Sequence, residues 1–71
     1  MINMEKRWIT ILCYETGEIN IYELSGEVLD KYYELSEEAF IKEIIGCNLY
    51  EIEWMITTSE PFITNEVLTL N

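Results

Sequence analysis

Alternating apolar and polar positions near the front of the chain predict a β-hairpin. Residues 7–24 read RWITILCYETGEINIYEL, in which β-branched and aromatic residues flank a single glycine, Gly17. This composition is typical of two short strands joined by a tight turn. We expect the hairpin to provide the face on which the rest of the chain packs.

The length of the hairpin loop decides the register of the two strands. A three-residue loop over residues 15–17, closed by a left-handed Gly17, pairs Ile11 with Ile21. A two-residue turn at 16–17 would instead pair Leu12 with Ile21 and scatter the isoleucines over both faces. Because a one-residue slip moves a whole strand to the opposite face, burial favours the three-residue loop. That register makes one apolar face from Ile9, Ile11, Cys13, Ile19 and Ile21, and a mixed face from Trp8, Thr10, Leu12, Tyr14, Glu18, Asn20, Tyr22 and Leu24.

Two stretches after the hairpin have helical spacing. Residues 27–35 (EVLDKYYEL) carry an apolar stripe at helical intervals, and Ser25 is available as the cap. The same stretch is compatible with a short strand or a loop, but its early acidic residues favour a helix. Residues 36–45 predict a firmer helix, with Ser36 as cap and Gly46 as stop. Its apolar face comprises Phe40, Ile41, Ile44 and Ile45.

A third strand is predicted over residues 49–58 (LYEIEWMITT), where alternation is regular. Tyr50, Ile52, Trp54 and Ile56 would face the core, and Glu51, Glu53, Met55 and Thr57 would face away. Residues 62–71 predict either a fourth, edge strand or a packed tail.

The order strand, strand, helix, strand predicts an α+β fold in a single domain over residues 1–71. We expect a two-layer β-β-α-β arrangement with a three- to four-stranded antiparallel sheet in the order 2-1-3, and one or two helices on one face. The opposite face of the sheet would remain uncovered, and it would carry Trp8, Leu12, Tyr14, Tyr22 and Met55.

Charge and size restrict the kinds of partner. The net charge is −10, with only four basic residues, so neither nucleic acid nor an anionic membrane is an expected partner. A basic protein surface is the natural complement. Burial and ordering entropy nearly cancel in a chain of this size, so self-association would add stability, and we expect a homodimer or an obligate partner.

Most catalytic chemistry is missing from the sequence. There is no histidine to act as general base or zinc ligand, and each glycine stands alone, so no phosphate-binding loop is present. Glu37 and Glu38, or Glu51 and Glu53, could act as carboxylate pairs or hold a cation, but such pairs usually form a solvated face. We therefore expect no enzyme activity, no cofactor and no metal site. The absence of an N-terminal apolar segment predicts a cytoplasmic protein in which Cys13 and Cys47 are free thiols. The alternative is a disulfide between them, since even pairs of cysteines occur in secreted domains.

These features favour a small acidic inhibitor that binds a basic, nucleic-acid-handling protein. In size, charge and isoleucine-rich usage the chain looks like the small proteins with which phages disable restriction and CRISPR systems, although no motif carries that likeness. The alternatives are a self-associating assembly module and, further off, a sponge for a nucleotide signal that would use Lys6 and Arg7. The expected partner-binding residues are aromatic and acidic side chains on the uncovered sheet face: Trp8, Tyr14, Glu18, Tyr22, Glu51 and Glu53.

Overall fold

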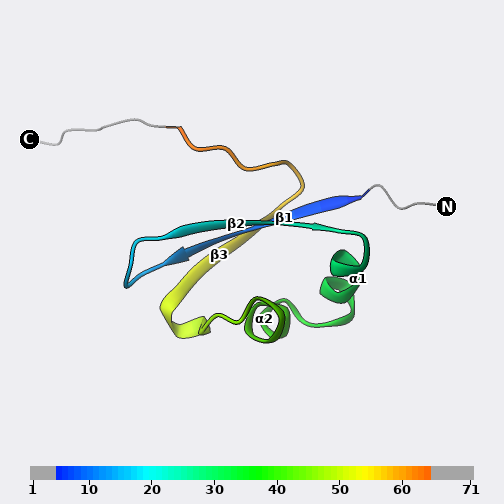
Figure 1. Cartoon of the computed structure of the whole chain (residues 1–71), viewed down its shortest axis with the longest axis horizontal. Coiled ribbons are helices and arrows are strands. Elements are labelled where there is room, and N and C mark those ends of the chain that lie inside the picture. The colour runs from blue at the N-terminus through cyan, green and yellow to red at the C-terminus, as the bar shows by residue number, and fades with distance from the viewer. Residues whose placement is uncertain (1–4, 65–71) are drawn as a thin grey trace, which may run out of the picture.

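The computed structural model describes residues 5–64 and has the predicted α+β architecture. A three-stranded antiparallel sheet has the order β2-β1-β3, and two helices pack on it (Figure 1). The elements are β1 (Lys6–Cys13), β2 (Ile19–Ser25), α1 (Gly26–Glu34), α2 (Glu37–Phe40), a π-helical turn η1 (Ile41–Ile45), a 3-10 turn η2 (Leu49–Glu51) and β3 (Ile52–Thr57). The strand order and the choice of helix for residues 27–35 are thereby confirmed.

The predicted hairpin register is wrong by one residue. Ile11 pairs with Asn20 rather than Ile21, and Ile9 pairs with Tyr22. The loop covers residues 14–17 rather than 15–17, since the amide of Cys13 donates to the carbonyl of Glu18 at 2.9 Å. The slip turns Ile19 and Ile21 to the outer face and brings Tyr22 and Leu24 to the helix side.

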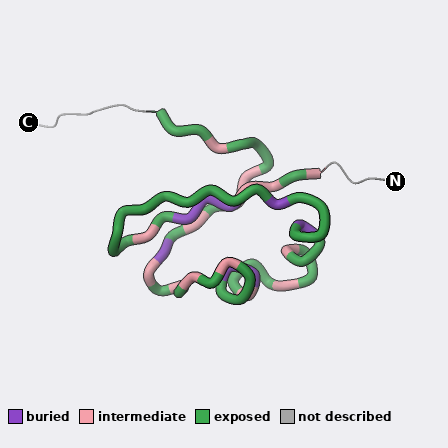
Figure 2. The backbone as a smooth tube through the Cα atoms, viewed as in Figure 1, coloured by how far each residue is buried: buried purple, intermediate pink, exposed green. Residues whose placement is uncertain are grey.

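The coverage of β2 explains why burial did not select the expected register. Leu24, next to α1, is the one fully buried residue of β2, and the rest of the strand is exposed (Figure 2). The helices therefore cover β1 and β3 more completely than they cover β2. The core comprises Ile9, Ile11, Leu24, Leu29, Phe40, Ile41 and Ile52.

The second helix begins where the sequence predicts and ends in a π-helical turn. The Ser36 hydroxyl accepts from the amide of Ala39 at 3.1 Å, and Gly46 ends the helix in a left-handed conformation. The expected apolar face is only partly correct. Phe40 and Ile41 are buried, but the wider π turn carries Ile44 outward, where it is half exposed.

The third strand is shorter than predicted. Its first residues form η2, in which the side chain of Asn48 accepts from the amide of Tyr50 at 3.1 Å. This cap turns Tyr50 out of the alternating pattern, so its side chain is 94% exposed instead of buried. Ile52, Trp54 and Ile56 do face the core, as expected.

The segment after β3 forms no strand over residues 58–64, and Phe62 and Ile63 are exposed. The remainder of the predicted fourth strand, residues 65–71, lies outside the described residues.

Candidate functional site

The hairpin loop and the start of β3 lie side by side at one end of the sheet. The amide of Tyr14 donates to the carbonyl of Glu51 at 2.9 Å, and Leu12 pairs with Glu53 in the β1–β3 ladder. The two segments bring four carboxylates to this end, which we call the acidic hairpin end: Glu15, Glu18, Glu51 and Glu53.

Tyr14 contacts both glutamates that β3 and η2 bring to the acidic hairpin end. Its phenol donates a hydrogen bond to Oε2 of Glu53, while its side chain remains 63% exposed. That hydrogen bond, with smaller contributions from burial and the Glu53 charge, raises the pKa of Tyr14 above its ordinary value. The site therefore presents an exposed neutral phenol among carboxylates.

Three of the four basic residues are paired away from the acidic hairpin end. Lys6 and Arg7 sit at the opposite end of β1, about 20 Å away at the usual rise along a strand. Each is already paired, Lys6 with Glu23 at 2.9 Å and Arg7 with Glu5. In α1, Nζ of Lys31 lies 3.9 Å from Oε2 of Glu34. The fourth basic residue, Lys42, lines the same pocket as Tyr50, which precedes Glu51 in the sequence. Among the described residues, no ion pair joins a cation to a carboxylate of the hairpin end.

The structure brings four of the six expected binding residues together. Tyr14, Glu18, Glu51 and Glu53 gather at the hairpin end, although Glu51 belongs to η2 and does not share a strand face with Glu53 as predicted. Trp8 is on the outer face as expected, but at the other end of β1, opposite Thr57. Tyr22 was expected on that face and instead lies on the helix side, because of the register slip.

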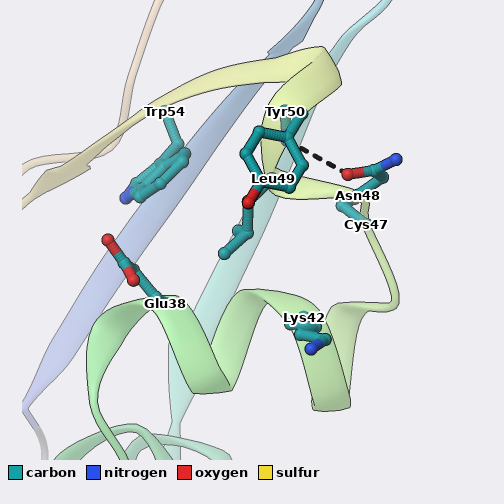
Figure 3. Close-up of a pocket in the computed structure, with 7 residues that line it drawn as sticks. All are labelled: Glu38, Lys42, Cys47, Asn48, Leu49, Tyr50 and Trp54. Atoms are coloured by element: carbon teal, nitrogen blue, oxygen red, sulfur yellow. Dashed lines mark hydrogen bonds between the residues drawn. The ribbon is translucent and has the colours of Figure 1, made fainter.

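A pocket of about 570 Å³ opens between the second helix and the segment that enters β3 (Figure 3). The rings of Tyr50 and Trp54 stand along one side with Leu49 between them, and Glu38 faces Trp54 from the helix. Sequence reasoning missed this site because it placed Tyr50 in the core. The one available signal was Asn48 after Gly46, a pair of residue types that favours a turn over a continuous strand.

The outer face of the sheet carries an apolar patch. Thr10 pairs with Ile21 and Met55, and Leu12 lies beside Ile19. The four apolar members, which we call the outer patch, are 41–53% exposed: Leu12, Ile19, Ile21 and Met55. The Thr10 hydroxyl at its centre is buried and has no hydrogen-bond partner among the described residues.

Cys13 and Cys47 are both free thiols and both partly exposed. The thiol of Cys13 lies against the hairpin loop, where hydrogen bonds from the Thr16 side chain, the Thr16 backbone and the Glu15 backbone lower its pKa.

Two other kinds of site are not formed within residues 5–64. No group of three or more cysteine, aspartate or glutamate side chains is placed to hold a metal ion. No helix in this part of the chain is long and apolar enough to cross a membrane.

Comparison with known proteins gives no match: no family model, no curated protein and no solved structure is significantly similar to the chain. The roles of the acidic hairpin end, the pocket and the outer patch are therefore inferred from their geometry alone.

Proposed function

We propose that this protein is a non-catalytic binding module whose acidic hairpin end docks on a basic surface of another protein. The observation that carries the proposal is that four carboxylates lie at the end of the sheet where Tyr14 contacts Glu53, and no ion pair among the described residues joins any of them to a basic side chain. Such a surface attracts a positively charged groove and speeds encounter with it.

The partner that fits best is a nucleic-acid-handling protein of a bacterial cell. Its Lys and Arg residues are arranged to bind phosphates, and a surface that carries carboxylates without cations competes for the same groups. Inhibition of a host defence or housekeeping protein by a phage-encoded chain in the cytoplasm agrees with the small size, the charge of −10 and the lopsided residue usage.

A charge-matched pair of variants tests the proposal. The first changes Glu15, Glu18, Glu51 and Glu53 to Gln, and the second changes Glu27, Glu34, Glu43 and Glu60 to Gln. Each takes the net charge from −10 to −6. Both are immobilised beside the wild type, and basic proteins retained from a bacterial lysate at low salt are eluted with a salt gradient.

We expect the hairpin-end variant to lose a partner that the wild type and the second variant retain, and we expect that partner to elute steeply with salt. Equal retention by both variants would show attraction to charge in general and would overturn the proposed docking site. The retained partner is then assayed for its own activity with and without the protein, and unchanged activity would contradict inhibition.

A second candidate function, self-association, is favoured by the outer patch. Four apolar side chains lie together around an unsatisfied hydroxyl, and exposed patches of this kind commonly mark interfaces. A second copy fits, because the centre of the patch is uncharged and two chains of charge −10 repel less when their carboxylates stay at the rim.

Sedimentation of the free protein tests this candidate. We expect a dimer that Ile21→Lys converts to a monomer. The control is Val28→Lys, which adds the same charge at an equally exposed apolar position on α1. A wild-type protein that sediments as a monomer, or an Ile21→Lys variant that stays dimeric, would show that the outer patch is not a dimer interface.

A further inference from the structure

We propose that the pocket beside the second helix receives the guanidinium group of an arginine side chain. This inference rests on the proposed function, because the arginine would belong to the basic partner. It assigns a specific contact to a part of the molecule that the acidic hairpin end does not include.

The two aromatic residues of the pocket are positioned differently, Tyr50 through its backbone and Trp54 through its ring. Asn48 caps the turn that projects Tyr50, and the Tyr50 side chain is 94% exposed. The indole of Trp54 donates from Nε1 to Oε1 of Glu37 at 2.6 Å, which fixes the ring. Since the indole N–H is already used, the ring offers a ligand its π face and edge rather than a hydrogen bond.

The chemistry of the lining favours a flat cation. A guanidinium group stacks on Trp and Tyr rings and also donates hydrogen bonds to a carboxylate. Glu38 supplies that carboxylate, and it points toward Trp54 across the pocket (Figure 3). An arginine that enters between helix and turn meets both kinds of partner at once.

Lys42 is the one basic residue of the lining, and it weighs against a cation. It follows Glu38 by one helical turn and lies on the same helical segment (Figure 3). The carboxylate of Glu37 lies against the indole nitrogen of Trp54, and the whole chain carries a charge of −10, so two carboxylates adjoin the pocket against one amine. The field therefore selects a cation over an anion.

The pocket is continuous with the acidic hairpin end. Tyr50 precedes Glu51, whose carbonyl accepts the amide of Tyr14. A basic surface seated on the hairpin end would thus bring its neighbouring side chains over the pocket. In this arrangement the carboxylates attract the partner and the pocket selects arginine over lysine.

Short oligoarginine and oligolysine peptides are suitable probes for the full-length protein. Binding is followed by titration of tryptophan fluorescence and by the indole N–H signal of Trp54 in NMR spectra. We expect oligoarginine to bind more tightly than oligolysine and to shift the Trp54 signal. Tyr50→Ala should weaken oligoarginine binding roughly two- to fivefold, which is the range of one exposed cation–π contact.

Matched controls separate the pocket from general charge. Phe62→Ala removes another exposed aromatic ring, and Glu27→Gln removes the same charge as Glu38→Gln from a distant face. We expect both controls to bind oligoarginine as the wild type does, and Glu38→Gln to lose part of the preference for arginine.

The outcomes distinguish the two proposals. Oligoarginine binding that is insensitive to Tyr50→Ala and Glu38→Gln but sensitive to the hairpin-end substitutions would overturn the pocket and leave the proposed function intact. Absence of binding to both peptides, together with equal lysate retention by the charge-matched variants, would overturn both. Binding of an aromatic phosphate in the pocket, displaced by neither peptide, would overturn the choice of a cation.

Discussion

The indole nitrogen of Trp54 donates a hydrogen bond to the carboxylate of Glu37 at 2.6 Å, which links β3 to the first turn of α2. The phenol of Tyr32, from α1, donates to the other oxygen of the same carboxylate at 3.4 Å. One surface glutamate therefore connects the two consecutive helices to β3. It also lies at the helix N-terminus, where a negative charge is favourable.

We expect Glu37→Ala to destabilise the fold. The loss of the Trp54 hydrogen bond should lower the free energy of unfolding by about 0.5–1.5 kcal/mol in urea denaturation. Glu37→Gln keeps an acceptor oxygen and should retain most of that stability, with the Trp54 indole N–H signal little moved. Equal losses in the two variants would show that the charge at the helix start matters and the hydrogen bond does not.

Gly46 ends the second helix with a φ of +86°, a conformation that side-chain-bearing residues rarely adopt. A Cβ at this position would meet no atom within 4 Å, so any cost of substitution is conformational. We expect Gly46→Ala to lower the free energy of unfolding by about 1–2 kcal/mol and Gly46→Asn by less, measured by thermal or urea denaturation. A Gly46→Ala variant with an unchanged free energy of unfolding would mean that the helix ends elsewhere in solution.

Much of the fold could be predicted because local chemistry agrees with the global arrangement. Ser36 and Gly46 mark the ends of one helical segment, and the alternation of Ile52, Trp54 and Ile56 identifies the inner face of β3. The antiparallel order β2-β1-β3 follows from a hairpin and one helical crossover.

The hairpin register could not be predicted, because burial selects a register only where the helices cover the sheet face. They cover β2 only near Leu24, so most of the strand is free of the selection that burial would impose. The same slip assembled the outer patch, which no strand pattern taken alone reveals.

The candidate site was predicted in part for a related reason. Net charge identified an acidic surface, but only the contact between Tyr14 and Glu51 shows which carboxylates come together. The pocket depends on the Asn48 cap, which overrides the alternation of the strand that follows it.

Two truncations on β2 distinguish the observed register from the expected one. Leu24 is 2% exposed and Ile21 is 41% exposed. We expect Leu24→Ala to lower the free energy of unfolding by about 2–5 kcal/mol, as for other buried leucines, and Ile21→Ala to change it far less at concentrations where the protein is monomeric. The register predicted from the sequence requires the reverse ranking. A Leu24→Ala variant so unstable that it does not fold still agrees with the observed register, provided that Ile21→Ala folds.

The reactivity of Cys13 should depend on the fold. Hydrogen bonds in the hairpin loop, the largest from the Thr16 side chain, lower the pKa of its thiol below the ordinary value of 9.0. In the folded protein the thiolate is therefore populated at a lower pH than in the unfolded chain. We expect iodoacetamide to alkylate folded Cys13 faster than denatured Cys13 near pH 8, with the two rates converging as the pH rises above 9. Mass spectrometry of the modified peptides gives both rates.

Thr16→Val removes the hydroxyl that contributes most to this shift, and Thr16→Ser keeps it. The valine variant should slow alkylation of folded Cys13 near pH 8, and the serine variant should leave the rate close to that of the wild type. Because the lowered pKa favours the folded state only where the thiol is ionised, the stabilisation from this group is full above the unfolded pKa and is lost as the pH falls through the folded one. A rate that is the same in Thr16→Val, Thr16→Ser and the wild type would show that access to the thiol, and not its ionisation, controls the reaction.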